Sequence, residues 1–248
     1  MIRPRRTERT KKPERKGTLG DLLSRLRDAI WKARVFVRLL LTDPRFNYVR
    51  FFRTVDARVH RRDRRRLSLQ VYGERALTET LQACERAGVT PFLLFGTLLG
   101  YHRDGGFITH DCDIDLGLCE KDIAELEQLK REMKKRGYYV NVESGCAIQF
   151  KKPRFRKLGV DFFFIGEEDG KAACSVGCDR SLGVCHYPPD MFSEFETVRF
   201  LRRLKVLAPK RTEEYLALTY GDWRTPDPDF DWRRDYQNVN VESGGPGG

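Results

Sequence analysis

Three aspartates at alternate positions, Asp111, Asp113 and Asp115, have the clearest potential for chemistry in this chain. Successive side chains of a β-strand point to opposite faces, so a strand here would place all three carboxylates on one face. Adjacent carboxylates repel one another, and hard oxygen ligands suit Mg²⁺ or Mn²⁺ bound to a substrate phosphate. We predict a metal site with Asp113 and Asp115 as main ligands and Asp111 as a secondary ligand.

Two other interpretations of the aspartates stay open at this point. A polar turn or helix-capping cluster would also be acidic, although the flanking Ile114, Leu116 and Leu118 favour a strand that enters a core. Glycosyltransferases that use nucleotide sugars and a metal also carry a pair of aspartates separated by one residue. The residues before the aspartates are needed to discriminate between these classes.

Gly96 and Thr97 follow a strand-like segment, 91–95, and begin a short helical segment that reaches His102. A residue without a side chain lets a phosphate approach the backbone amides at a helix N-terminus. The threonine hydroxyl can add a hydrogen bond or cap the helix. Alone, this pair is common in structural turns. Followed one short helix later by the aspartates, it predicts a nucleotidyltransferase centre that binds substrate through Gly96 and Thr97.

Further candidate site residues lie on neighbouring segments. Asp161 is a single acidic residue within an otherwise apolar strand, 159–165, where an unpartnered carboxylate would be costly. We predict that it is a metal ligand or the base for an acceptor hydroxyl; a salt bridge to an arginine is the alternative. Lys151 and Lys152 end the preceding strand and are candidate phosphate ligands, with solvated surface lysines as the alternative.

The pattern of these segments resembles the LicD and fukutin family of phosphotransferases in three places. Residues 96–117 read GTLLGYHRDGGFITHDCDIDLG and are similar to the family's GTLLG, GGFI and DxDID block. Residues 159–166, GVDFFFIG, look like its second aspartate strand. Residues 220–226, YGDWRTP, look like its C-terminal YGDW block. The resemblance covers roughly residues 70–232.

The resemblance implies a nucleotidyltransferase-like fold and a metal-dependent phosphotransferase. Its donor would be CDP-linked, and it would move phosphocholine, ribitol phosphate or a similar group to a glycan hydroxyl. The family position of Arg103 is usually basic, so we expect Arg103 to contact a donor phosphate. Asp222 of the YGDW block could face the acceptor or the donor. The sequence departs from the family at His110, often Trp, and at Cys112, often Asp.

The periodicity of the chain predicts an α/β (α+β) fold, with a mixed, nucleotidyltransferase-like sheet flanked by helices. Helices are expected at 64–87, 120–136 and 212–219. Strands are expected at 91–95, 111–118, 138–142, 146–151, 159–165, 171–176 and 196–201. We predict a basic, partly disordered extension over 1–62, a catalytic domain over 63–236 and a disordered tail over 237–248.

The composition is strongly basic, with 47 Lys and Arg against 36 Asp and Glu and a net charge of +11. Such charge favours nucleotides, nucleic acid or anionic membranes as partners. Segment 19–42 reads as a basic amphipathic helix that could lie on an anionic membrane or pack on the domain. No apolar run is long enough to span a bilayer, and no signal-peptide pattern is present. These features predict a cytoplasmic protein with peripheral membrane contact.

The seven cysteines do not suggest a disulfide framework, because their number is odd and no glycosylation sequon accompanies them. Cys174, Cys178, Cys185 and His186 could supply four zinc ligands. Their spacing is not a standard zinc pattern, and adjacent ligands converge poorly on one tetrahedral ion, so we predict reduced thiols instead.

The rival functions differ in what they would release. A glycosyltransferase would release a nucleoside diphosphate and add no phosphate to the acceptor. A nucleotidyltransferase would move a nucleoside monophosphate. A nucleic-acid or membrane-binding module would use the basic N-terminus beside a degenerate centre, but the intact acidic set argues against that class, and nucleic acid is not an expected partner.

Overall fold

The computed structural model of the chain describes residues 61–241, apart from residues 157, 178–182, 202 and 228, together with positions 26, 29, 30, 33 and 37. The chain divides into two compact units, Met1–Phe51 and Phe52–Gly248. All the labelled elements below belong to the second unit. Most of the predicted extension over 1–62 and the tail after residue 241 lie outside the described residues.

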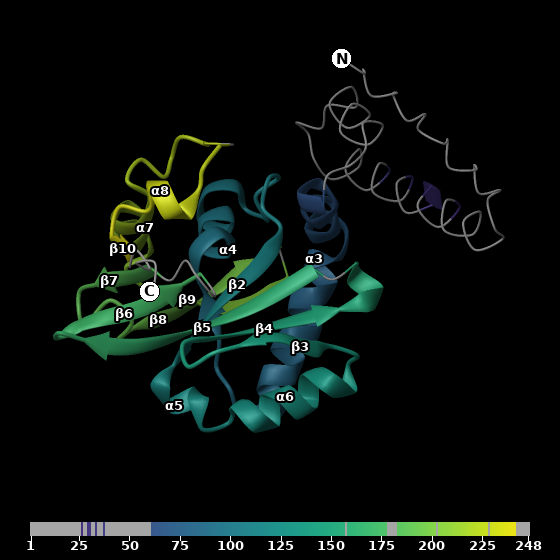
Figure 1. Cartoon of the computed structure of the whole chain (residues 1–248), viewed down its shortest axis with the longest axis horizontal. Helices are drawn as coiled ribbons and strands as arrows, with labels where there is room; N and C mark the ends of the chain where they lie inside the picture. Colours follow the sequence, from purple (N-terminus) through teal and green to yellow (C-terminus); the bar gives the residue numbers. More distant parts are fainter. Residues whose placement is uncertain are drawn as a thin grey trace, which may run out of the picture. The chain divides into compact units, whose positions relative to one another are not determined.

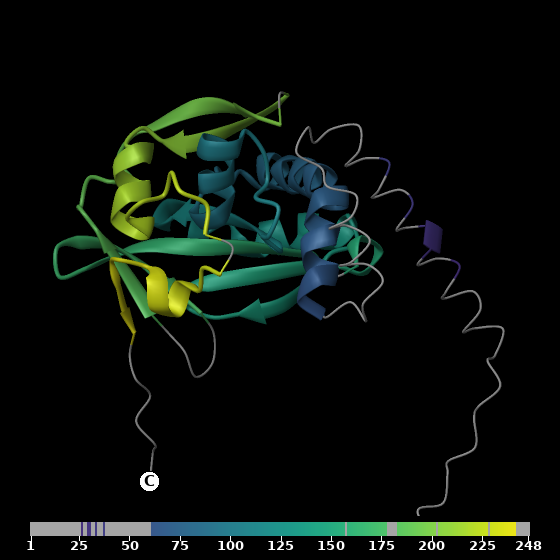
Figure 2. The same ribbon diagram turned by 90° about the horizontal axis from the view of Figure 1, so that it is seen from above.

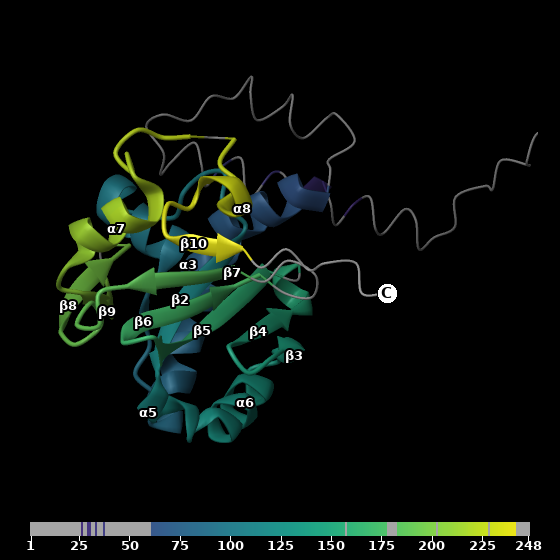
Figure 3. The same cartoon turned by 60° about the vertical axis from the view of Figure 1, so that its left-hand side comes forward.

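A mixed sheet forms the centre of the second unit (Figure 1). Its strands are β1 (Phe92–Leu93), β2 (Asp113–Cys119), β3 (Tyr139–Glu143), β4 (Ala147–Lys152), β5 (Leu158–Glu168), β6 (Lys171–Val176), β7 (Gly183–Tyr187), β8 (Phe195–Phe200), β9 (Leu204–Pro209) and β10 (Val239–Val241). The main order is β10-β7-β6-β5-β2-β1-β9-β8, and β4 pairs with both β3 and β5 (Figure 3). The predicted α/β class with a mixed sheet is confirmed.

Helices lie on both sides of this sheet. They are α3 (Arg61–Ala87), α4 (Phe95–Leu99), α5 (Glu120–Ile123), α6 (Leu126–Lys135), α7 (Thr212–Tyr220) and α8 (Trp232–Asp235), with a π-helical turn at Gly100–Asp104 and a 3-10 turn at Pro153–Phe155. In Figures 1 and 3, α5 and α6 lie on one side of the sheet and α7 and α8 on the other. Helix α7 lies beside α4, as Figure 2 also shows. No helix among the described residues has both the length and the apolar character needed to cross a membrane.

Two expectations about element boundaries differ from the structure. The helix predicted at 120–136 is divided into α5 and α6, because Asp122 is buried and its carboxylate accepts a hydrogen bond from the Thr90 N–H at 3.0 Å. That contact ties α5 to the segment before β1. In the tail predicted as disordered over 237–248, Val239–Val241 instead forms β10 against β7. Two β-branched valines on alternate residues suit such an added strand.

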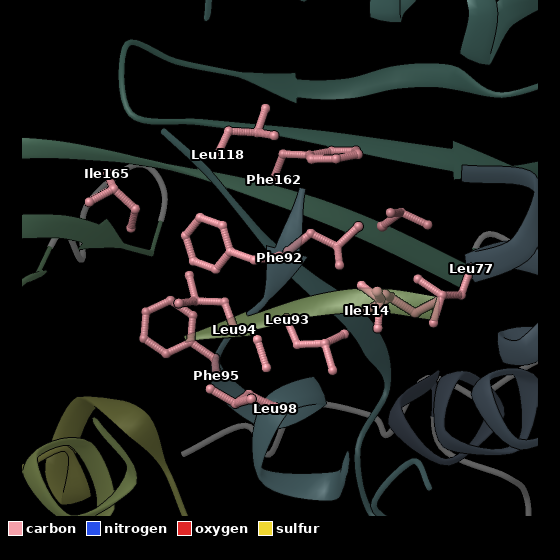
Figure 4. Packing of buried hydrophobic residues seen from close by; sticks show 14 of the residues in the cluster. Leu77, Phe92, Leu93, Leu94, Phe95, Leu98, Ile114, Leu118, Phe162 and Ile165 are labelled. Carbon is pink, nitrogen blue, oxygen red and sulfur yellow. The ribbon is translucent and has the colours of Figure 1, made fainter. Parts of the chain in front are cut away.

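The apolar face of β2 fixes the register of the central strands. Ile114, Leu116 and Leu118 are fully buried, as is Phe162 on β5, and α3 covers this region through residues such as Leu77 (Figure 4). Each such side chain contributes about 1.5–3 kcal/mol when buried. A slip of one residue would turn the alternate aspartates toward the apolar face that α3 covers. The core therefore determines on which face the carboxylates lie.

A buried ion pair connects β4 to α3 on the side away from the aspartates. The Lys152 ammonium lies 2.5 Å from Glu79 Oε2 and over the rings of Tyr138 and Phe155, at 4.9 and 4.6 Å. The Tyr138 hydroxyl donates to the same Glu79 oxygen at 3.3 Å. Arg75 holds the other oxygen at 2.9 Å. This arrangement anchors the end of β4 to the long helix.

Replacement of Lys152 by Met should lower the free energy of unfolding by about 3 kcal/mol. The change keeps most of the unbranched side chain but removes the ammonium, which leaves Glu79, only 17% exposed, to form its ion pair with Arg75 alone. Removal of one partner of a buried pair typically costs about 3–5 kcal/mol, and Arg75 places this case at the lower end. Urea denaturation measures the effect, with the exposed Lys171→Met on β6 as the matched control.

The same pair makes stability depend on pH. Burial raises the pKa of Glu79, but Lys152 and Arg75 together outweigh burial and hold the pKa below its ordinary value of 4.5. The stabilisation is therefore complete above about pH 4.5 and is lost as the pH falls through the lower folded-state pKa. The difference between wild type and Lys152→Met should shrink in that acid range; a constant difference would contradict this account.

Candidate active site

The parallel pairing of β2 with β5 brings the predicted acidic residues together. Asp115 lies directly opposite Asp161, and Asp113 lies opposite Gly159. Residues paired in this way share a face of the sheet, so aspartates that are far apart in the sequence become neighbours. Asp111 immediately precedes β2. The structure thus places Asp111, Asp113, Asp115 and Asp161 in one cluster, here called the acidic centre.

A strained turn directs the chain from β1 into α4 beside the acidic centre. Phe95 has a φ of 40°, in the left-handed region that few non-glycine residues adopt. Its N–H donates to the Tyr215 hydroxyl at 3.2 Å, and its ring packs edge-on against Phe163 and stacks on Tyr236. These contacts offset a strain of the order of 1–3 kcal/mol. The turn places Gly96 against the carboxylates.

Gly96 and Thr97 form a reciprocal pair of hydrogen bonds with Asp115. The Gly96 N–H donates to Asp115 Oδ2 at 3.1 Å, and the Asp115 N–H donates to Thr97 Oγ1 at 2.8 Å. A Cβ on Gly96 would lie only 2.4 Å from Asp111 Oδ2. The sequence predicts that both residues bind a phosphate. In the structure, the Gly96 amide donates to the Asp115 carboxylate, and the hydroxyl of the buried Thr97 accepts a hydrogen bond from the backbone of β2.

Burial and mutual repulsion dominate the electrostatics of the acidic centre. Burial raises the pKa of Asp115 well above its ordinary value, and the charges of Asp113, Asp111 and Asp161 raise it further. The Gly96 N–H acts in the opposite direction. Burial likewise raises the pKa of Asp111, followed by the charge of Asp113. The centre therefore concentrates negative charge that favours a compensating cation.

The donor set of the acidic centre fits a divalent cation. One ligand atom from each of Asp111, Cys112 and Asp113 lies within 4.8 Å of the others, and all three residues are partly exposed. Asp115 and a buried oxygen of Asp161 lie on the adjoining row of the sheet. Carboxylates suit Mg²⁺ and Mn²⁺, whereas a thiolate suits softer metals. From the sequence, the cysteine stands out only as a departure from a family pattern.

An amide that contacts Asp161, and a second amide that contacts the first, were not identified from the sequence. Gln149 of β4 lies opposite Asp161, and its Nε2 donates to Asp161 Oδ2 at 2.9 Å. Asn141 of β3 donates from Nδ2 to Gln149 Oε1 at 2.8 Å. The period-two alternation of β4 around Gln149 is a signal that could have identified it, because an amide at that position shares the aspartate face.

Two tyrosines from the C-terminal part also adjoin the acidic centre. The rings of Tyr220 and Tyr236 meet edge-on at 5.4 Å, and Tyr236 stacks on Phe95. Burial raises the pKa of both hydroxyls well above the ordinary value, and the charge of Asp115 contributes to both shifts. Tyr220 belongs to the YGDW block, so this block borders the site through its tyrosine.

Arg103 connects the turn after α4 to the YGDW block. Its guanidinium is bidentate to Asp104, at 3.1 and 3.0 Å, and donates to the Trp223 carbonyl at 3.3 Å. The adjacent His102 ring packs edge-on against Trp223 at 5.1 Å. The predicted phosphate contact of Arg103 is not tested by these bonds, but they give the residue a structural role in joining two distant segments.

The remaining predicted binding residues lie in different places. Lys151 shares the row of Gly159 and Asp113, on the face of the acidic centre. Lys152 points to the other face and is held by Glu79, so the structure does not bring it to the acidic centre. Asp222 is exposed and accepts a hydrogen bond from the Thr225 hydroxyl at 2.7 Å within its own turn.

The four candidate zinc ligands do not come together within the described residues. Cys174 and Cys185 lie opposite each other on β6 and β7 and are fully buried. His186 points to the opposite face, where its Nε2 lies 2.8 Å from Glu168 Oε2. Cys178 is outside the described residues. Burial raises the pKa of the Cys174 thiol well above its ordinary value and that of Cys185 to about 12.

Comparison with known proteins identifies relatives of this chain. The chain is 26% identical over 194 residues to the ribitol-5-phosphate transferase FKTN of Mus musculus, covering 75% of this chain and 38% of the relative. It is 28% identical over 162 residues to the FKTN of Homo sapiens, covering 62% of this chain and 33% of the relative. The chain thus spans little more than a third of the length of these relatives.

One solved structure and one family model complete the comparison. The crystal structure of ANT(2")-Ia in complex with adenylyl-2"-tobramycin aligns with a TM-score of 0.34 and 16% identity, over 54% of this chain and 68% of that one. The family model described as LicD/FKTN/FKRP, nucleotidyltransferase domain, matches residues 88–211. That match spans half of the chain and contains the acidic centre, so the protein belongs to the LicD/FKTN/FKRP family.

Proposed function

We propose that this protein is a phosphotransferase that moves a substituted phosphate from a CDP-linked donor to a glycan hydroxyl. The observation that carries the proposal is the placement of Asp115 beside Asp161, with Asp113 and Asp111 in the same cluster. The FKTN relatives bear the name ribitol-5-phosphate transferase, which supports a phosphate-containing group as cargo. Ribitol phosphate and phosphocholine are both compatible with this class.

A divalent cation, Mg²⁺ or Mn²⁺, would be held by Asp113 and Asp115, with Asp111 as a secondary ligand. When bound, it would neutralise charge on the diphosphate of the donor. Cys112 lies beside these carboxylates, and its thiol suits neither ion as well as a carboxylate would. The repulsion among the aspartates supports this assignment, because without a bound cation their clustered negative charges destabilise the folded protein.

The protein's own residues then have distinct tasks in the transfer. Gly96 and Thr97 hold Asp115 in place through the two hydrogen bonds described above. Asp161 accepts the proton of the acceptor hydroxyl. The oxygen of that hydroxyl attacks the phosphorus of the substituted phosphate, and the bond from this phosphorus to the departing CMP oxygen breaks. The products are CMP and a phosphodiester on the acceptor. Lys151, on the same face, is a candidate contact for the transferred phosphate.

The first test is the release of CMP from a panel of CDP-linked donors in the presence of Mg²⁺ or Mn²⁺. Asp113→Asn should lower the rate by more than about 100-fold, because loss of a ligand should exceed the roughly 10–100-fold effect of outer partners. A chelator should abolish release. Asp169→Asn is the matched control: Asp169 is exposed at a β5–β6 turn with a φ of 51°, which asparagine tolerates.

Outcomes other than loss of CMP release would redirect the assignment. Full activity of the Asp113→Asn, Asp115→Asn double variant would contradict the proposed catalytic role of the acidic centre. Release of CDP or UDP from nucleotide sugars, without phosphate on the acceptor, would indicate glycosyl transfer instead.

Substitution of Gly96 by Ala tests the close approach of α4 to the carboxylates. The added Cβ would meet Asp111 Oδ2 at 2.4 Å and Asp115 Oδ2 at 3.3 Å, so the acidic centre must shift. We expect CMP release to fall by about 10–100-fold, comparable to loss of an outer partner. Gly145→Ala should have no effect, because nothing lies within 4 Å of its Cβ position. Equal activities of the two variants would contradict this account.

We also propose that the N-terminal unit contacts an anionic membrane. At the described positions, Leu26, Ile30 and Val37 are helical and about half exposed. A spacing of four and seven residues is the sequence pattern of side chains that share one face of an amphipathic helix, and the surrounding sequence is rich in Arg and Lys. Basic residues near an anionic surface contribute about 1 kcal/mol each. An acceptor carried by a membrane lipid would suit such a location.

Vesicle sedimentation tests the membrane contact. The full chain should bind vesicles that contain phosphatidylglycerol and should bind pure phosphatidylcholine poorly, with binding weakened at high salt. Ile30→Glu should reduce binding several-fold. The control Val140→Glu adds the same charge at an exposed apolar position on β3 and should not. Equal binding by both variants would argue against the helix face as the contact.

A further inference from the structure

A row of polar side chains crosses three strands and ends on the carboxylate of Asp161. The row runs from Asn141 on β3 through Gln149 on β4 to Asp161 on β5, with bonds of 2.8 and 2.9 Å. Gln149 and Asp161 are a directly opposed pair of the β4–β5 ladder, and a register shift in β3 lies at Asn141. On the other side of Asp161, Asp115 of β2 is the directly opposed residue, so it lies in line with the row.

The chemistry of the groups sets the direction of every bond in the row. An ionised carboxylate only accepts, so Gln149 must turn its Nε2 toward Asp161. Its Oε1 then faces Asn141, which must turn its Nδ2 toward Gln149. Neither amide can reverse without placing an oxygen against an oxygen. Asn141 therefore holds Gln149 in the orientation that the carboxylate requires, although it does not touch the aspartate.

The bond to Gln149 also determines where the second oxygen of Asp161 lies. Gln149 engages Oδ2, while Oδ1 is buried and lies 3.4 Å from the point where a Cβ on Gly159 would be. Gln149 Nε2 and the Asp113 Cβ lie 3.3 and 3.4 Å from the same point. The absence of a side chain at Gly159 leaves this position to side-chain atoms from three strands.

We propose that Gln149, oriented by Asn141, is a positioning residue that fixes the Asp161 carboxylate for catalysis. Without the amide, repulsion from Asp113 and Asp115 would turn the Asp161 carboxylate out of the orientation that the Gln149 hydrogen bond gives it. The role rests on the proposed phosphotransferase function. It assigns to β3 and β4 a part in the reaction beyond completing the sheet.

Variants that keep side-chain size test the proposal against a simpler role in strand pairing. Gln149→Met keeps length and packing but removes the donor. Asn141→Asp keeps shape but can only accept, so either the introduced carboxylate or that of Asp161 must face the Gln149 oxygen. Gln128→Met is the matched control, since Gln128 on α6 likewise hydrogen-bonds to another side chain, accepting from Arg131 Nε at 2.8 Å.

The decisive measurement is kcat and KM for CMP release, with the fold checked by the backbone ¹H–¹⁵N spectrum and the thermal midpoint. We expect Gln149→Met and Asn141→Asp each to lower kcat about 10–100-fold, the range for outer partners, with the KM of the CDP donor within about threefold. Gln128→Met should match wild type. Wild-type kcat in Gln149→Met, or a fall explained by lost folding, would overturn the proposal.

A second readout separates this proposal from the proposed function. In the wild-type chain, the Gln149 side-chain amide protons should exchange with solvent more slowly than those of Gln128, and Asn141→Asp should shift the ¹³Cγ resonance of Asp161. If the wild type releases no CMP, the proposed function fails, and these signals still test the positioning. Rapid exchange at Gln149, or an unchanged Asp161 resonance in Asn141→Asp, would overturn it.

Discussion

The repulsion among the four carboxylates of the acidic centre, three of which lie on the parallel strands β2 and β5, is the constraint on which the rest of this structure depends. The β2–β5 register places Asp115 beside Asp161, and burial intensifies their interaction. Such an arrangement persists only where other contacts hold it. On one face, apolar residues such as Leu116 fix the register. On the other, the Gly96 amide and the Gln149 amide each donate to one of the opposed carboxylates.

The C-terminal part of the chain stabilises the turn that places Gly96 beside Asp115. The Tyr215 hydroxyl accepts the Phe95 N–H, and Arg103 donates to the Trp223 carbonyl. Segments that are separate in the sequence are therefore joined physically at two points. This accounts for the YGDW block, in which no acid–base logic is evident from the residues alone. Its contribution is to hold the segment that carries Gly96, and Tyr220 borders the acidic centre.

The sequence predicted the strands that carry the aspartates, because acidic and apolar residues alternate at the start of β2 and because β5 is an apolar run around a single aspartate. It did not identify β7, β9, β10 or α8, since short segments such as Val239–Val241 carry little periodic signal. The cluster of Asp111, Asp113, Asp115 and Asp161 was expected as a set of candidates. The partners of Gln149 and Lys152 could not be predicted, because they depend on the strand register and on which elements cover each face of β4.

The parallel pairing of β2 with β5 also has a consequence for how the chain folds. The residues between these two strands form α5, α6, β3 and β4, all of which can form through contacts local in sequence. Closure of the β2–β5 ladder requires a long loop to be ordered first, and such non-local pairings form slowly. Electrostatic repulsion between Asp115 and Asp161 is therefore absent from early folding species and enters only at ladder closure. Assembly of the acidic centre is thus a late step, after the neighbouring hairpin and helices have already acquired their shape.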